Sequence, residues 1–460
     1  MLLPSPFVIA CSYCLALGSF AACGDGEKQA RKPKDTIADA PIGVDVPGTT
    51  PTDVATDPTD APAASAGMPD PQFGTAGIAT FKTAKNDDRG RAVAVLDDGR
   101  LLVAGKSKDD FIILRTSIDG ALDTGFGTQG FATTDFKSGY DEAKSFGLLA
   151  GGAFVLGGIT TRDGDADFGL AKYDANGRLD LSVSDDGKAA ASFGAHSDEG
   201  KAVVVLSDGD IVMAGQTSDG SQNDFALARF DGATGALDEN FGTAGKVTFD
   251  FGGKKNDEGN AIRRHGDGLV VAGYSATAGN EDFAVARFGL DGEIDGQFGS
   301  SGKTTTSVGD VDIAFALAVQ DDQKIVLAGV SFEGATPGCA VARYSATGAL
   351  DADFGKSGIA RFRPVDVDFT CTALAIDSVG RIVVAGTARQ GNDASFAVLR
   401  FDTMGELDPS FAGVGVSYVS IGPADGAYAM ALQSEDRMVV VGETKFDDDV
   451  DIAVLRFLGR

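Results

Sequence analysis

The sequence predicts an all-β protein, a seven-bladed β-propeller of four-stranded antiparallel blades closed by the N-terminal strand completing the last blade. Three observations predict it. One cassette recurs seven times along the 460-residue chain, at spacings of 53 to 58 residues. Each copy contains short strand-like segments separated by tight-turn residues, and no helical period appears between them. A fixed period of this length is typical of stacked or closed repeat architectures.

The clearest mark of each copy is the motif Leu-Asp-x-x-Phe-Gly-x-x-Gly, which is complete at 122–130, 237–245 and 350–358. In the third copy, Val183 stands where the other copies carry phenylalanine. The phenylalanine of the mark recurs at Phe73, Phe126, Phe241, Phe298, Phe354 and Phe411. The mark therefore fixes the phase of all seven copies.

Four strands are expected in each copy, at 92–96, 100–105, 110–115 and 131–136 in the first complete one. Asp-Gly turns such as 98–99 suit the positive backbone φ of tight hairpins. The second and third strands are continuously apolar, which indicates that both faces of each sheet are covered. Because no helix is available to cover them, neighbouring sheets must do so, and sheets packed around an axis form a propeller.

The two ends of the repeat region predict how the ring closes. The chain enters the repeats with a fourth-type strand at 78–81, which has no predecessors in its copy. It ends with a third-type strand at 452–457, which has no successor. If the first strand completes the last blade, no sheet edge stays unpaired.

One pair of charges also recurs, a basic residue at the end of each third strand and an aspartate at the start of each following mark. We predict structural ion pairs, with a charged ring for a ligand as the alternative. The third copy offers Lys172 and Asp180 at these positions. The other pairs are Arg115 with Asp123, Arg229 with Asp238, Arg287 with Asp295, Arg343 with Asp351, Arg400 with Asp408, and Arg456 with Asp70.

The segments DGRLLVAG (98–105) and DFAVARF (282–288), together with the Leu-Asp-x-x-Phe-Gly-x-x-Gly mark, resemble the delta-60 repeat family of bacterial exported proteins. The resemblance covers 73–460. It implies a propeller-like fold, and it carries no catalytic residue over to any position of this chain.

The N-terminus predicts an export signal. Residues 2–22 carry no charge and are mostly apolar, and the segment ends in Phe20-Ala21-Ala22-Cys23, which resembles the lipobox of bacterial lipoproteins. The resemblance implies cleavage before Cys23 and lipid attachment to its sulfur. We therefore expect a signal peptide at 1–22, a lipidated cysteine and disordered tether at 23–67, and the propeller at 68–460. The expected location is the cell envelope, anchored by lipid to the outer membrane; an uncleaved signal anchor is the alternative.

Composition excludes some classes of partner. A net charge of −28 without a basic stripe argues against nucleic acid. The only histidines, His196 and His265, lie in no metal-ligand pattern and are expected in loops. Cys339 and Cys371 are the two cysteines of the repeat region. The sequence leaves a disulfide between them open; the unpaired form is favoured, because no other copy has cysteine at either position.

Three functions remain for the ring: a binding scaffold, a calcium-binding propeller and an enzyme. The scaffold is favoured because of the acidic loops that lie before the first strand and between the second and third strands of each copy. Because these loops emerge on one face, we expect a monomeric, non-enzymatic scaffold that binds an envelope protein or ligand there. The alternative is a calcium-binding propeller, since alternating aspartates have the spacing of a calcium loop. The calcium candidates are Asp163, Asp165, Asp167, Asp447, Asp449 and Asp451. An extracytoplasmic hydrolase or lyase at the central channel comes third, with Arg263 and Arg264 on a first-type strand as its candidates; no other cofactor is expected.

Overall fold

The computed structural model describes residues 65–459, except 85–86, 138, 163, 254, 277–279 and 448. The predicted signal peptide, Cys23 and most of the predicted tether lie outside the described residues. Within them the protein is all-β, with no α-helix and with two single turns of 3-10 helix, η2 (Ala150–Gly152) and η3 (Ser434–Asp436).

The strands follow one another as four-stranded units. The N-terminal strand is β1 (Ile78–Phe81). Four complete units follow: β2 (Asp88–Val95), β3 (Leu101–Ser107), β4 (Asp110–Thr116), β5 (Phe131–Thr134); β6 (Glu142–Leu148), β7 (Phe154–Arg162), β8 (Asp165–Tyr173), β9 (Lys188–Ala191); β10 (Asp198–Val205), β11 (Ile211–Ser218), β12 (Asn223–Phe230), β13 (Lys246–Phe249); β14 (Asp257–His265), β15 (Gly268–Ser275), β16 (Asp282–Gly289), β17 (Lys303–Thr306). The remaining strands are β18 (Val311–Val319), β19 (Ile325–Glu333), β20 (Thr336–Tyr344), β21 (Ile359–Phe362); β22 (Asp368–Ile376), β23 (Ile382–Gln390), β24 (Asp393–Phe401), β25 (Val416–Val419); β26 (Ala424–Leu432), β27 (Met438–Phe446), β28 (Asp449–Phe457).

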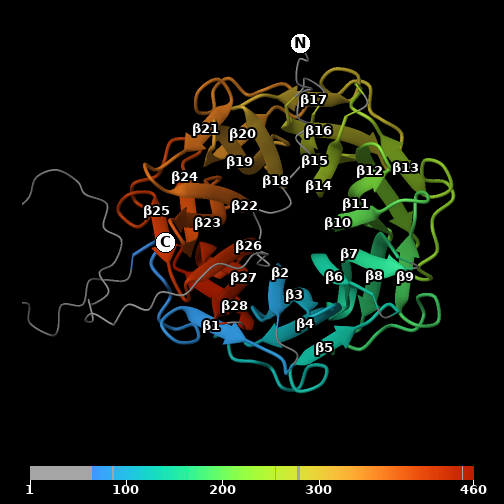
Figure 1. Ribbon diagram of the computed structural model, residues 1–460, viewed down its shortest axis with the longest axis horizontal. Helices are drawn as coiled ribbons and strands as arrows, with labels where there is room; N and C mark the ends of the chain where they lie inside the picture. The colour runs from blue at the N-terminus through green and yellow to red at the C-terminus, as the bar shows by residue number, and fades with distance from the viewer. Residues whose placement is uncertain are drawn as a thin grey trace, which may run out of the picture. The chain divides into compact units, whose positions relative to one another are not determined.

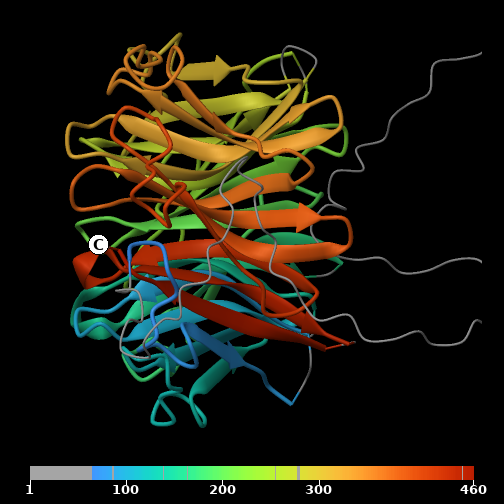
Figure 2. The same ribbon diagram turned by 90° about the vertical axis from the view of Figure 1, so that its left-hand side faces the viewer.

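Pairing within the units is antiparallel and sequential. Five separate sheets have four strands each, from β2–β5 to β18–β21. The other eight strands form one sheet, in which a single parallel bridge between Ala394 and Ala424 joins β22–β25 to β26–β28. In Figure 1 the sheets follow one another around a common axis, with the first strand of each unit innermost, and Figure 2 shows the same sheets from the side.

The chain's first strand belongs to its last sheet. β1 pairs antiparallel with β28, with Ile78 opposite Leu455. Just upstream, the Gly67 amide donates a hydrogen bond to the Leu458 carbonyl at 2.8 Å, and Ala66 is buried. Residue 67 is thus hydrogen-bonded to the residue that follows β28, and residue 66 is buried, at the end of the segment predicted as a tether.

The mark builds the turn that leads from the third strand to the fourth. Phe126 is fully buried, and its amide donates to the Asp123 carbonyl. Gly130 has φ +97°, a conformation that favours glycine. In the third copy Val183 takes the buried place of the phenylalanine, and Ser184 adopts φ +49° where five of the other six copies have glycine. The turn therefore survives the loss of two signature residues.

The core consists of apolar layers between neighbouring sheets. Seven clusters of buried side chains occur among the described residues, and each combines residues of two neighbouring four-stranded units. One of them joins Leu101 and Ile112 of the first complete sheet to Val439 and Val454 of the last. Since sheets cover one another on both faces, the continuously apolar second and third strands are explained.

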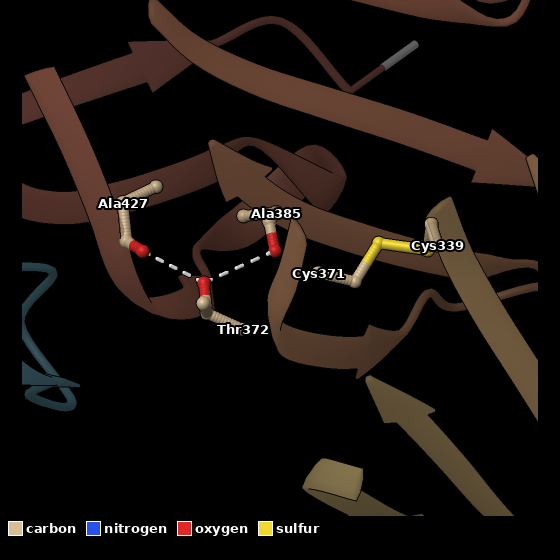
Figure 3. Close-up of a disulfide and its surroundings, with 5 residues drawn as sticks. All are labelled: Cys339, Cys371, Thr372, Ala385 and Ala427. Carbon is tan, nitrogen blue, oxygen red and sulfur yellow. Dashed lines mark hydrogen bonds between the residues drawn. A yellow bond between two sulfur atoms is a disulfide. The ribbon is translucent and has the colours of Figure 1, made fainter. Parts of the chain in front are cut away.

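Cys339 and Cys371 form a disulfide, with a Cα–Cα distance of 5.2 Å (Figure 3). The favoured unpaired form is wrong, because the two strands that carry them are adjacent. Cys339 lies on β20 and Cys371 on β22, the first strand of the next sheet. The hydroxyl of the neighbouring Thr372 donates to the Ala427 carbonyl on β26 at 2.7 Å. The sheet of β22–β25 is thus bound to both neighbours through two consecutive residues.

Candidate functional site

The structure brings every predicted pair of repeat charges together. Lys172 lies 3.0 Å from Asp180, and the Arg287–Asp295 contact is also made. The remaining distances are 2.7 Å for Arg115–Asp123, 3.2 Å for Arg229–Asp238, 2.8 Å for Arg343–Asp351, 2.8 Å for Arg400–Asp408 and 2.8 Å for Arg456–Asp70.

Each arginine of these pairs has further partners. Arg115 Nη1 donates to the Ala175 carbonyl of the next sheet at 2.6 Å, and its guanidinium lies 4.8 Å from the centre of the Phe126 ring. Arg343 repeats both contacts, with the Thr403 carbonyl at 2.7 Å and the Phe354 ring at 4.5 Å. Such a guanidinium binds its own turn and the next sheet at once, which is a structural role and leaves little free for a ligand.

A second set of charges lies on the innermost strands, and we call it the inner belt. Arg91 on β2 contacts Glu142 on β6 at 2.6 Å and Glu443 on β27 at 3.3 Å. Its guanidinium also lies 3.8 Å from the centre of the Tyr428 ring. The full belt comprises Arg89, Arg91, Tyr140, Glu142, Lys144, Glu199, Lys201, Glu258, Tyr274, Tyr428 and Glu443.

Burial and mutual charge set the ionisation of the belt. Burial alone raises the pKa of Glu142, but Lys144 and Arg91 together hold it well below its usual range. Burial raises the pKa of Tyr428 to about 12. Burial, helped by the Glu142 charge, also raises the pKa of Tyr140. The contacts of the belt therefore pair its charges, and Tyr140 and Tyr428 are protonated at neutral pH.

The belt covers only part of the circle. It runs from β26 and β27 through β2, β6 and β10 to β14 and β15, as Figure 1 allows the reader to follow. On β18 and β22 the corresponding residues are uncharged: Ile313, Phe315, Thr370 and Thr372. The sequence analysis missed the belt, although alternating charges at 89–91, 142–144 and 199–201 mark it.

The two arginines proposed for the channel do not converge on one site. Arg263 is exposed on β14 and donates to its neighbour's carbonyl, that of Ile262, at 2.8 Å. Arg264 is half-buried and lines a hollow of about 490 Å³ with Leu148 and Val205. No described residue joins the pair to form a catalytic group.

His265, which was expected in a loop, ends strand β14 and is buried. Its Nδ1 accepts a hydrogen bond from Arg287 Nε at 3.1 Å, and its Nε2 lies 3.0 Å from the Gln323 carbonyl. Burial lowers the pKa of His265, so the neutral ring with its proton on Nε2 fits both partners. The prediction failed because His265 takes part in the Arg287 ion-pair cluster. His196 is exposed in a loop, as expected.

Among the described residues, the calcium candidates form no group of three carboxylates close enough to share an ion, although Asp449 and Asp451 lie near each other on β28. Asp165 and Asp167 lie on β8, and Arg162 binds Asp167 at 2.8 Å. Asp447 is exposed, and Asp449 lies 3.7 Å from Lys82. Asp163 lies outside the described residues. Instead, two other groups of three carboxylates lie close enough to share an ion: Asp110 with Asp135 and Asp141, and Asp224 with Asp250 and Asp257.

These groups lie on the predicted acidic face, where the second-to-third and inter-unit loops meet. The opposite face is acidic too. There, however, the aspartates of the repeat ion pairs, such as Asp123 and Asp351, are neutralised by arginine. Among the described residues, no helix has the length and apolar character needed to span a membrane.

Comparison with solved structures finds propeller-like neighbours of low similarity. Virginiamycin B lyase from Staphylococcus aureus is 10% identical, over 82% of this chain and 99% of that chain, with a TM-score of 0.48. Drosophila Semaphorin 2a is 9% identical, over 85% and 76%, with a TM-score of 0.49. Sqt1 from Chaetomium thermophilum is 14% identical, over 83% and 97%, with a TM-score of 0.43. At these values the likenesses carry no argument about function.

A comparison of the sequence with curated proteins finds no match. Four segments match the family model described as "Domain of unknown function (DUF5122) beta-propeller", namely 96–126, 206–241, 265–298 and 380–411. They fall in four different copies of the repeat. These matches support a propeller-repeat family and the β-propeller fold for this chain.

Proposed function

We propose that the chain is a non-enzymatic, monomeric binding scaffold of the cell envelope, a closed ring of seven blades of the delta-60 repeat type. Closure is supported by the pairing of β1 with β28 and by the apolar cluster between the first and last sheets. In a closed ring whose sheets are all covered, no edge strand is left exposed to pair with another chain. Stability then resides in the ring, and its loops are free to carry recognition.

The observation that carries the scaffold proposal is the gathering of carboxylates on one loop face. Carboxylates at the start of β4 and in the segments after β5 and before β6 gather there, and so do those of β12, of the segment after β13 and of β14. The same face exposes apolar side chains beside the charge, with 39% of Tyr140, 86% of Val365 and 41% of Phe446 accessible. Charge mixed with apolar area favours a partner with a basic, partly apolar surface.

The non-enzymatic reading is supported by the inner belt. Its acidic and basic groups hold one another, as Arg91 does with Glu142 and Glu443.

The envelope location rests on the sequence before the ring. We propose lipid attachment at Cys23 and a tether that holds the ring near the outer membrane, with membrane affinity supplied by the buried acyl chains. Metabolic labelling with a fatty acid is expected to mark the wild-type chain and to be lost in Cys23→Ala. Equal labelling of both would contradict the anchor.

An experiment that removes charge from one face at a time tests the scaffold proposal. A variant of the full chain replaces four exposed aspartates of the acidic face by asparagine: Asp109, Asp219, Asp393 and Asp447. A matched control replaces four exposed aspartates of the opposite face: Asp119, Asp291, Asp321 and Asp353. Binding of a lysine-rich peptide that contains tyrosine and leucine is measured at low and physiological salt.

The acidic-face variant is expected to bind the peptide more weakly than the wild type, and the control variant is expected to bind like the wild type. The difference should shrink as salt rises, because surface charges are screened over about 8 Å at physiological ionic strength. Equal loss in both variants would mean that net charge alone attracts the peptide, and the proposed face would be wrong.

A further inference from the structure

One position near the end of the first strand is occupied differently in a single copy of the repeat. The residue there pairs with the apolar residue near the start of the second strand. In the fourth unit this residue is Arg264, which pairs with Leu269. In the other copies it is aliphatic: Val95, Leu148, Val205, Val319, Ile376 and Leu432. A charged side chain thus stands where the packing of every other copy uses an apolar one.

Arg264 has no carboxylate partner within the described part of the chain. Most described arginines form ion pairs, as Arg287 does with Asp267 and Asp295. Arg264 forms none, and its Nη2 donates to the Gly266 carbonyl at 3.2 Å. The contact with Arg287 is the main cause of the lowered pKa of Asp267, and the charge of Arg264 contributes less. Asp267 therefore belongs to Arg287 and does not neutralise Arg264.

Arg263, the preceding residue on β14, is a second arginine without an ion pair among the described residues. It is exposed, and its Nη1 donates to the Ile262 carbonyl at 2.8 Å. The net charge of the chain is −28, so two consecutive arginines without carboxylate partners are an exception in this protein. They give this part of the ring a positive potential that attracts anions.

Arg264 also lines a hollow of about 490 Å³. The hollow lies where three consecutive innermost strands end, β6, β10 and β14, which can be followed in Figure 1. Leu148 is 42% exposed, and a Cβ added to Gly209 would meet no atom within 4 Å, so the hollow is open to solvent. The rest of its lining is mostly aliphatic: Leu148, Leu149, Ala150, Val205 and Leu206, with Ser207 and Gly209 at the turn. One guanidinium therefore stands beside an aliphatic wall.

This combination defines the chemistry of a ligand. A guanidinium presents parallel N–H donors that match the oxygens of a carboxylate, sulfonate or phosphate group. The aliphatic wall favours an apolar body, because burying that body removes apolar surface from water. The volume lies within the range of small-molecule pockets, about 300–1,000 Å³. An anionic membrane surface is a poorer fit, because the acidic chain as a whole is repelled by it.

We propose that Arg264 and the hollow beside it bind a small organic anion, with its charged group on the guanidinium and its apolar body against Leu148 and Val205. The first strands end on the face that carries the marks, opposite the acidic loop face. The site therefore does not depend on the scaffold proposal, and its failure would leave that proposal standing.

A pair of fluorescent probes tests the site on the full chain. Anilinonaphthalene sulfonate has an apolar aromatic body and one anionic group, and its fluorescence rises when it leaves water for an apolar site. Phenylnaphthylamine has the same body without the sulfonate. The wild type is expected to bind the sulfonate probe saturably and more tightly than the neutral probe. Equal affinity for the two probes would show that no anion is recognised and would overturn the proposal.

Arg264→Leu is the central variant, because it installs the side chain that the repeat has at Leu148 and Leu432 and should leave the fold intact. It is expected to bind the sulfonate probe about 10- to 100-fold more weakly, since hydrogen bonds to a charged group are lost, and to bind the neutral probe like the wild type. Arg264→Lys keeps the charge and should retain most of the affinity.

Arg389→Leu is the matched control for net charge. Arg389 is exposed near the end of β23, on the acidic face, and forms no ion pair among the described residues. This variant should bind the sulfonate probe like the wild type. Equal affinity in Arg264→Leu and the wild type, or an equal loss in Arg389→Leu, would overturn the proposal.

Leu148→Glu tests the hollow without changing Arg264. Both residues line it, so the new carboxylate should pair with Arg264 and compete with the anion. We expect the sulfonate probe to lose affinity by about the same factor as in Arg264→Leu. Unchanged binding in Leu148→Glu would place the probe outside the hollow, and the proposed site would be wrong.

Discussion

The Cys339–Cys371 disulfide replaces a packing contact that other junctions of neighbouring units make between a phenylalanine or isoleucine and a glycine or alanine. Cys339 pairs with Phe362 as Phe111 pairs with Thr134, so it occupies the phenylalanine position of the third strand. Cys371 pairs with Gly386 as Gly259 pairs with Gly273, so it occupies the small-residue position of the next first strand. A Cβ added to Gly259 would lie 3.6 Å from Phe225 Cγ, which shows how closely ring and backbone pack at an ordinary junction.

The stabilisation can be estimated from the loop that the bond closes. The cysteines are 32 residues apart, and chain entropy for that separation gives about 3.7 kcal/mol at 25 °C. Divided by the unfolding entropy of a folded part of roughly 390 residues, this free energy corresponds to a rise of about 4–5 °C in the unfolding midpoint. Restoring the repeat's own pair by Cys339→Phe with Cys371→Gly loses the cross-link but buries an aromatic ring, worth about 1.5–3 kcal/mol.

Thermal unfolding with and without reductant distinguishes these contributions. Reductant is expected to lower the midpoint of the wild type by about 4–5 °C and to leave the Cys339→Phe/Cys371→Gly variant unchanged. That variant should unfold between the oxidised and reduced wild type, and a Cys339→Ala/Cys371→Ala variant should unfold below it because of the cavity left at Cys339. If the phenylalanine–glycine variant unfolded below the alanine variant, the two cysteines would not occupy the repeat's packing positions, and the alignment of junctions would be wrong.

Three further predictions follow from the ring, the belt and the buried carboxylates. Asp70→Asn leaves Arg456 buried without its ion-pair partner, so denaturant titration should show a free energy of unfolding that is lower by about 3–5 kcal/mol. Asp123→Asn, at a more exposed equivalent pair, should lower it by less. Equal losses would contradict a special role of the Arg456–Asp70 pair in joining the two ends of the chain. Arg91→Ala should likewise cost about 3–5 kcal/mol, because Glu142 and Glu443 lose their shared cation, and a loss under about 1 kcal/mol would show that the belt is solvated. Because burial raises the pKa of Asp257 to about 6 in the folded state, from an ordinary value of 3.8, its stabilising contribution is complete below pH 4 and is lost as pH rises through 6. Asp257→Asn should therefore raise the unfolding midpoint relative to wild type more at pH 7 than at pH 4, and the opposite trend would show that the pKa of Asp257 is not raised.

The features that could be predicted from the sequence are those that recur in most copies of the repeat. Strand order, hairpin turns, the mark around Phe126 and the Arg115–Asp123 type of pair each recur along the chain, and one alignment of the copies reveals them. The disulfide, the inner belt and the carboxylate groups depend on contacts between two copies. Asp224 and Asp257, for example, belong to different units, and only the sheet register brings them together. His265 was wrongly predicted to lie in a loop, because the sequence analysis paired Arg287 only with Asp295 and did not reveal the hydrogen bond between Arg287 and His265.

The positions where the copies differ carry more information about function than the positions where they agree. A ring needs each blade to cover the next, so the shared residues answer that demand and repeat with little change. The belt breaks the symmetry by placing charge on one part of the circle and uncharged side chains at Phe315 and Thr372 on the rest. The junctions break it again, because five of them avoid a third aspartate and two accept it. At one of these two junctions, the charges of Asp250 and Asp224 help burial to raise the pKa of Asp257, so the third aspartate changes the ionisation of that junction and distinguishes it from the rest of the ring.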